Sequence, residues 1–167
     1  MTRARRAPAD APPRPLTDLA CACATARQAA RVLTQLYDQR LRGTGMEAPQ
    51  FALLVTLSNE GPCSQATLGR RYALDKTTVS RNLKVLERNG WIRSLVPSDK
   101  RERRFALTPG GRRQLAAARP AWKAAQAHVR SALGAEQWDG MFRTLAAVTA
   151  AAQRLLGAAP GTRVSPR

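Results

Sequence analysis

Six residues between positions 76 and 84 carry side chains suited to binding DNA. They are Lys76, Thr77, Thr78, Ser80, Arg81 and Lys84. All except Thr78 fall at positions i, i+1, i+4, i+5 and i+8, so they share one face of an α-helix. Serine and threonine hydroxyls are short enough to reach base edges, and the cations can hold phosphates. We therefore predict that this helix enters a major groove.

The other face of the same helix is apolar. Val79, Leu83 and Leu86 fall at i, i+4 and i+7, which is the spacing of a stripe that packs on a core. Asp75 is a good N-cap, and Gly90 is a good stop after the last turn. A solvated helix whose polar first turn has no partner would show the same pattern, so that alternative stays open.

A second short helix precedes this one, with Ser64 as its expected N-cap. Two short helices in tandem are typical of a helix-turn-helix. The short hydroxyls at the start of the second helix are poor helix formers, because they compete with the backbone for hydrogen bonds. A DNA contact accounts for them better than helix propensity does.

A basic hairpin follows the two helices. Pro97-Ser98-Asp99 predicts its turn, and Arg101, Arg103 and Arg104 crowd the tip and the return strand. Like charges at such density need an external anion, which a phosphate backbone beside the minor groove would supply. Asp99 could pair with Arg101 and fix its direction. The alternative is a charged hairpin that only resists edge-to-edge pairing.

In their order along the chain, these motifs resemble the MarR family of winged helix-turn-helix transcriptional regulators. The resemblance covers residues 16–156 and rests on the helix Asp75–Leu83, the Leu-Glu-Arg-Asn-Gly helix end, the Ser98–Arg101 wing tip and Leu107–Gly111. It implies a homodimer that binds double-stranded DNA at a pseudo-palindromic operator and represses nearby genes. A small aromatic or phenolic ligand, bound between the winged domain and the dimer base, would release the DNA.

Two residues depart from the family pattern. Ala48 stands where a serine or threonine cap is usual, so we expect a less well capped helix start there. Thr67 replaces the glutamate of a Ser-x-x-Glu capping box, which leaves Ser64 and Gln65 as expected DNA contacts.

The expected fold is mainly α-helical with a small β-hairpin wing, a winged helix-turn-helix on a helical dimerisation base. The expected units are a disordered basic arm (1–15), a dimerisation region (16–45 and 109–156), a DNA-binding domain (46–108) and a flexible tail (157–167). A long amphipathic helix is expected over Thr17–Leu41, capped by Thr17. Thr108 is the expected cap of the helix after the wing. A last helix, about Glu136–Leu156, has surplus apolar surface that points to a partner chain.

The net charge of the chain limits the classes of function that it can have. With 28 Lys and Arg against 11 Asp and Glu, the net charge is +17, which favours nucleic acid and a steep salt dependence. A nonspecific architectural DNA binder is the alternative from another class. The single histidine, His128, has no nucleophile or paired carboxylates near it, so we expect no enzyme, cofactor or metal site. No stretch is long enough to span a membrane, and a cytoplasmic location is expected.

Three cysteines raise a second mode of regulation. We expect Cys21 and Cys23 to lie on the first helix, where side chains two residues apart point to nearly opposite sides and cannot easily bridge. Cys23 shares the apolar stripe and should be buried, whereas Cys21 is the better reactive thiol. Cys63 should be a small hydrophobe. Because some MarR relatives sense peroxides with a cysteine in this neighbourhood, thiol-based sensing by Cys21 or Cys23 is the alternative to an aromatic ligand, whose candidate walls are Trp91, Tyr37 and Phe51.

Overall fold

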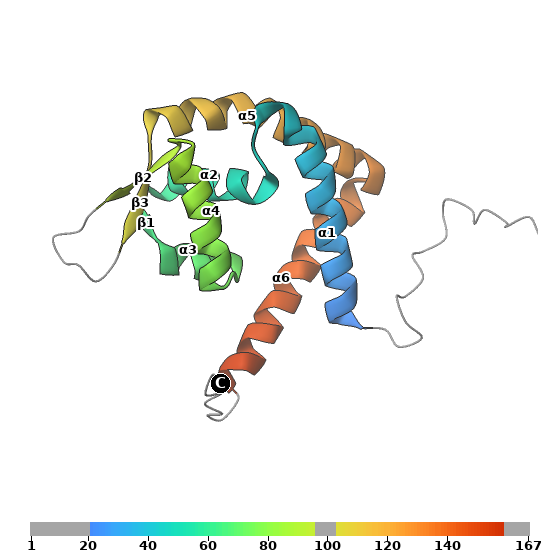
Figure 1. Cartoon of the computed structure of the whole chain (residues 1–167). Helices are drawn as coiled ribbons and strands as arrows, with labels where there is room; N and C mark the ends of the chain where they lie inside the picture. Colours follow the sequence, from blue (N-terminus) through green and yellow to red (C-terminus); the bar gives the residue numbers. More distant parts are fainter. Residues whose placement is uncertain (1–20, 96–102, 159–167) are drawn as a thin grey trace, which may run out of the picture.

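The computed structural model describes residues 21–95 and 103–158 (Figure 1). In this part of the chain, helices dominate and three short strands complete the fold. The elements are α1 (Ala22–Leu41), the 3-10 turn η1 (Arg42–Thr44), α2 (Ala48–Glu60), β1 (Cys63–Ser64), α3 (Gln65–Tyr72), α4 (Lys76–Arg88), β2 (Ile92–Leu95), β3 (Arg104–Leu107), α5 (Pro109–Leu133) and α6 (Ala135–Ala158).

The strands form one antiparallel sheet in the order β1-β3-β2. β2 and β3 are the expected hairpin, in which Ile92 pairs with Leu107. β1 is an addition to that expectation, because Cys63 pairs with Phe105 on the other edge of β3. A two-residue strand carries no periodic pattern, so sequence reasoning had no signal for it.

The core lies where α2, α3, α4 and the sheet meet. Val79, Leu83 and Leu86 on α4 are all at most 1% exposed, which confirms the predicted inner face of this helix. Phe105 from β3 and Leu68 from α3 complete the same cluster. This burial fixes how α4 is rotated, and its polar side is therefore turned to solvent.

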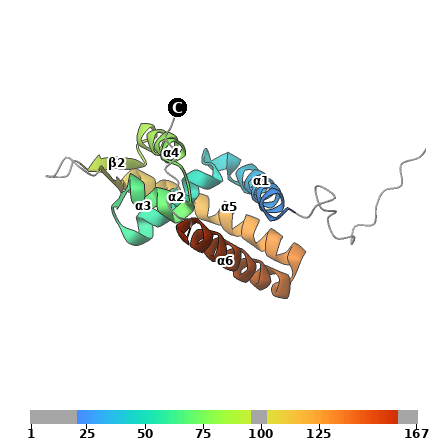
Figure 2. The same ribbon diagram turned by 90° about the horizontal axis from the view of Figure 1, so that it is seen from below.

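The remaining helices are arranged around α5, which itself adds Leu115 and Ala118 to the core. It packs against α1, α2 and α6, and Figure 2 shows α5 and α6 side by side. The Tyr37 hydroxyl on α1 donates to Oε1 of Gln126 on α5 at 2.7 Å, and burial raises the pKa of Tyr37. Phe51 on α2 stacks on Trp122 of α5 with ring centroids 5.5 Å apart.

The first described helix begins later than expected. α1 starts at Ala22, and Cys21 is its N-cap in an extended conformation (φ −109°, ψ 108°), with Sγ accepting from the Ala24 amide. The predicted cap, Thr17, lies outside the described residues. Because Cys21 is not helical, the argument that helical spacing separates it from Cys23 was wrong. The expected burial of Cys23 was also wrong, since both thiols are exposed.

The start of α2 is better capped than expected. Glu47 is the N-cap, and its side chain and that of Gln50 form a reciprocal capping box. Oδ1 of Asp38 on α1 also accepts the Ala48 amide at 2.7 Å. Asp38 is ten residues away in sequence, so the local pattern around Ala48 could not reveal it.

Three other predicted caps are confirmed. Ser64, Asp75 and Thr108 each precede their helix in an extended conformation and accept an amide of its first turn. Asp75 also accepts the hydroxyl of Thr78 at 2.6 Å. These hydrogen bonds from the Thr78 hydroxyl and amide hold the pKa of Asp75 below its usual range.

The inner face of α4 should dominate the stability of the winged part. Leu86→Ala removes a fully buried side chain and should lower the free energy of unfolding by roughly 2–5 kcal/mol. Lys84→Ala, on the exposed face of the same helix, should change it by no more than about 0.5 kcal/mol. Urea unfolding checks both, and equal effects would contradict this packing.

Acid should loosen the start of α4 through Asp75. Because its folded pKa is lowered, the ionised carboxylate favours folding above the usual pKa of aspartate, and this contribution is lost as pH falls through the lowered value. Asp75→Asn keeps a capping oxygen but does not titrate. The urea midpoint of unfolding should therefore drop further for the wild type than for the variant when the pH is lowered from neutral to about 3. Parallel falls would contradict the role of Asp75.

Candidate nucleic-acid interface

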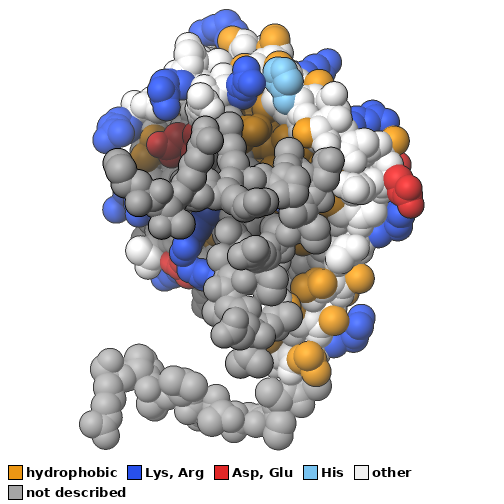
Figure 3. Space-filling view, turned by 90° about the vertical axis from the view of Figure 1, so that its right-hand side faces the viewer, with side chains coloured by type: hydrophobic (Ala, Val, Ile, Leu, Met, Phe, Trp, Pro, Cys, Tyr) orange, Lys and Arg blue, Asp and Glu red, His pale blue; other side chains and the backbone are white. Residues whose placement is uncertain are grey.

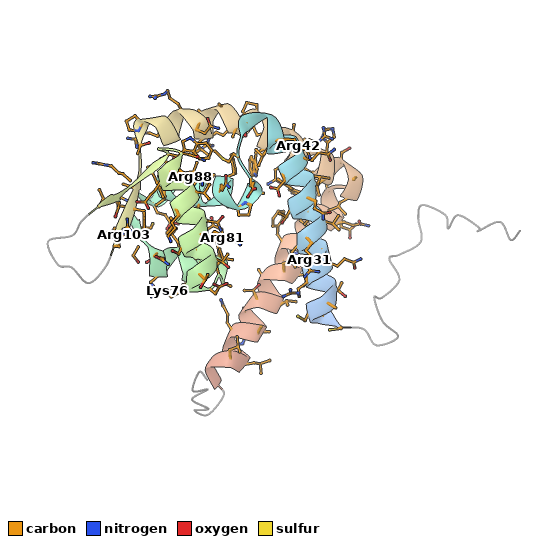
Figure 4. All side chains as sticks on the ribbon, in the orientation of Figure 1. Arg31, Arg42, Lys76, Arg81, Arg88 and Arg103 are labelled. Atoms are coloured by element: carbon orange, nitrogen blue, oxygen red, sulfur yellow. The ribbon has the colours of Figure 1, made fainter. Side chains whose placement is uncertain are left out.

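The polar face of α4 forms an open hollow of about 570 Å³. Figure 4 shows Lys76, Arg81 and Arg88 spread along this helix from its start to its end. The residues that line the hollow are Lys76, Thr77, Ser80, Arg81, Lys84, Val85 and Arg88. The structure therefore brings together five of the residues that the sequence proposed for DNA contact.

Thr78 has a different place from its neighbours. It is half-buried, and its hydroxyl donates to Oδ2 of Asp75 within the cap. Its role in the structure is to hold the first turn of α4, which presents Lys76 and Thr77 to solvent.

The two expected contacts at the start of α3, its N-cap Ser64 and its first residue Gln65, are also used within the fold. Ser64 is 3% exposed, and its hydroxyl accepts the Thr67 amide at 3.2 Å. Ser64 therefore serves as a capping residue within the fold, and its contact with DNA stays a prediction. Gln65 donates from Nε2 to the Lys76 carbonyl at 3.0 Å, so it braces the start of α4 against α3.

Two arginines, one just before β3 and one at its first position, attach this return strand of the wing to the rest of the domain. Arg103 donates from Nε to the Ser94 hydroxyl at 2.8 Å, lies 3.4 Å from Oε1 of Glu87 on α4, and covers the ring of Phe105. Arg104 donates to the Pro62 carbonyl at 2.6 Å. Asp99 and Arg101 lie outside the described residues, so their pairing and their DNA contacts stay predictions.

Two basic residues at this surface were missed by sequence reasoning. Arg88 continues the exposed face one turn beyond Lys84, and this four-residue spacing is the sequence signal that could have identified it. Arg70 on α3 lies at a second hollow, of about 550 Å³, which it shares with Lys76 and Arg103. Arg70 could not be found from sequence, because that hollow forms only when α3, α4 and the wing strand meet.

The cysteines fall into two environments. Cys21 and Cys23 line one surface hollow on α1 together with Arg27 and Arg31. Cys63 is 6% exposed. Its burial, and to a lesser extent the charge of Glu60, raises the pKa of its thiol. Within residues 21–95 and 103–158, no cluster of three or more His, Cys, Asp or Glu side chains is arranged to hold a metal ion.

The three aromatic residues expected to wall a ligand site take part in packing. Phe51 is 4% exposed and stacks on Trp122, Tyr37 bonds to Gln126, and Trp91 packs against the core cluster.

In the described segments, no helix combines the length and hydropathy needed to cross a membrane.

Similarity to known proteins identifies the family of this chain. The MarR family model matches residues 46–102. The chain is 32% identical over 81 residues to the uncharacterized HTH-type transcriptional regulator YwoH of Bacillus subtilis, a match that covers 48% of this chain and 59% of YwoH.

Solved structures extend the likeness beyond the winged part. The M. tuberculosis transcriptional regulator MosR, in complex with DNA, is 37% identical, with a TM-score of 0.73 over 81% of this chain and 98% of MosR. Reduced AbfR bound to DNA is 26% identical, with a TM-score of 0.67 over 80% of this chain and 92% of AbfR.

MarR-family proteins are transcription factors and not enzymes, in agreement with the expectation drawn from the sequence. The buried inner face of α4, its exposed basic face and the wing beside it are the parts that such a protein needs. The chain belongs to the MarR family and is a DNA-binding transcriptional regulator.

Proposed function

We propose that two copies of this chain form a dimer that represses transcription by binding a pseudo-palindromic operator through α4 and the wing. The observation that carries this proposal is the division of α4 into a buried apolar face and an exposed face with Lys76, Thr77 and Arg81. A helix with such a face fits a major groove, where its first turns approach the base edges.

The exposed residues divide by the chemistry that each can perform. Arg81 lies near the middle of the exposed face, where a guanidinium can bond in two places to a guanine edge. Thr77 and Ser80 are short enough to reach neighbouring bases. Lys76 and Lys84 are suited to phosphates, which set the register without reading sequence. Arg101 and Arg103 remain our candidates for wing contacts to the DNA backbone, with Asp99 pairing with Arg101 to fix its direction.

Unpartnered apolar surface on α1 and α6 supports the dimer. Figure 3 shows hydrophobic side chains at the surface on the side of the molecule that carries these helices. The large exposed apolar residues of the described segments all belong to these two helices: Val32, Phe142, Leu145, Val148, Leu155 and Leu156. A single domain seldom exposes so much apolar surface without a partner. A second copy of the same chain would cover both helices across a two-fold axis, as in other symmetric dimers.

Operator preference tests the proposal. Anisotropy at near-physiological salt should show that the protein prefers a duplex from its own upstream region over a shuffled duplex by at least ~10³-fold. Equal, salt-sensitive binding to both duplexes would contradict the proposal and support the architectural alternative.

Arg81→Ala should weaken operator binding by about 1–3 kcal/mol and relax specificity at one position. Arg112→Ala removes an exposed arginine from α5 instead and is the matched control, because it changes the net charge equally and should leave specificity intact. Circular dichroism should be the same for both variants. Equal losses would mean that total charge, and not the position of Arg81, sets the affinity.

Two kinds of effector are candidates for releasing the DNA. Release by a small aromatic or phenolic ligand stays a prediction, which would act by favouring the arrangement that cannot bind DNA. Exposure of both Cys21 and Cys23 favours thiol-based sensing as a second candidate, because an oxidant in solution can reach them. AbfR, which is similar in fold, has a structure of its reduced form bound to DNA.

Peroxide should release operator DNA if the thiols are the sensor. The double variant Cys21→Ser, Cys23→Ser should then stay bound after peroxide treatment, with unchanged affinity in its reduced state. Cys63→Ser should respond like the wild type, because the thiol of Cys63 is buried and its pKa is raised. Anisotropy before and after treatment provides the measurement, and release of the double variant would exclude this pair.

A further inference from the structure

The turn that follows α4 is hydrogen-bonded to the start of α5, although β2 and β3 lie between them in the chain. After Arg88 the chain leaves α4 through a tight turn, with the Gly90 amide bonded to the Glu87 carbonyl and the Trp91 amide to the Leu86 carbonyl. Gly90 has φ +69°, which glycine adopts without strain. The carbonyls of Gly90 and Trp91 then face the first turn of α5.

Thr108 fastens these two carbonyls. Its amide donates to the Trp91 carbonyl at 3.0 Å, and its hydroxyl donates to the Gly90 carbonyl at 2.7 Å. The same hydroxyl accepts the Gly111 amide at 2.9 Å, as the N-cap of α5. One side chain therefore holds the exit of α4 and the entry of α5 together.

Gly111 permits this close approach. A Cβ at this position would overlap the carbonyl oxygen of Trp91 and lie 2.8 Å from its carbonyl carbon and 2.9 Å from Cδ1 of Leu107. Two of these three atoms belong to the backbone, which cannot rotate away. Any larger residue must push the end of α4 away from α5.

A small displacement at this joint becomes large at the other end of α4. The helix has 13 residues, so at 1.5 Å per residue it is roughly 20 Å long. A tilt of about 10° at one end moves the other end by about 3 Å, which exceeds the few tenths of an ångström that a hydrogen bond to a base edge tolerates. Long lysine and arginine side chains can still follow phosphates over such a shift.

We infer that Thr108 and Gly111 are positioning residues for operator recognition: they set the angle at which the helical base holds α4. The inference rests on the proposed operator binding. α5 is the helix that packs against both α1 and α6, so the joint links each reading helix to the elements that face a second copy. Loss of the joint should therefore reduce specific binding more than nonspecific binding.

Two variants with matched controls test this role. Gly111→Ala is compared with Gly110→Ala, one residue earlier in the same helical turn, where the nearest atom to a new Cβ is the Gly90 carbonyl oxygen at 3.4 Å. Thr108→Val, which removes the hydroxyl at nearly constant shape, is compared with Thr108→Ser, which keeps it. Each is measured on operator and on shuffled duplex, with circular dichroism and size by light scattering.

Gly111→Ala and Thr108→Val should lose at least about tenfold in the ratio of operator to shuffled affinity while keeping fold and size. Both controls should stay within about threefold of the wild type. If Gly111→Ala does not fold, Thr108→Val decides. Folded variants with the wild-type ratio, or with equal losses on both duplexes, would overturn the inference alone. A wild type without operator preference would overturn the proposed function as well, because there would be no specific recognition to position.

Discussion

Burial of one face of α4 is the constraint on which the rest of the site depends. Val79, Leu83 and Leu86 pack into the core, and with these three positions fixed, the rotation of the helix has no freedom left. Lys76, Thr77, Ser80, Arg81 and Lys84 face solvent as a consequence. The apolar residues of α4 thus place the polar ones, and the chemistry of the surface follows from the packing beneath it.

Attachments at its two ends keep this helix in place. At the start, Asp75 and Thr78 close the cap, and Gln65 bonds to the Lys76 carbonyl. At the end, Thr108 ties the following turn to α5. Arg103 has a similar holding role in the wing. Its interactions with Ser94 and Glu87 fix the strand that leads out of the wing tip. Several residues near the DNA face therefore act by holding others.

Much of this arrangement could be predicted from the sequence, because it is local. The caps at Ser64, Asp75 and Thr108 and the stripe on α4 are set by residues a few positions apart, and each was confirmed. Errors arose where the deciding partner is distant. Asp38 caps α2 from another helix, and β1 exists only through its pairing with β3. Cys23 was misjudged because an apolar stripe does not tell a core from a surface still awaiting a partner.

In the proposed complex, two copies of α4 read two halves of one operator. Hydroxyl-radical footprinting of the upstream DNA tests it most directly, since it reports which sugars the protein covers. We expect two protected segments related by a two-fold axis, with centres roughly 10 base pairs apart or a multiple of that spacing. Uniform protection along the duplex, or a single protected segment without symmetry, would contradict it.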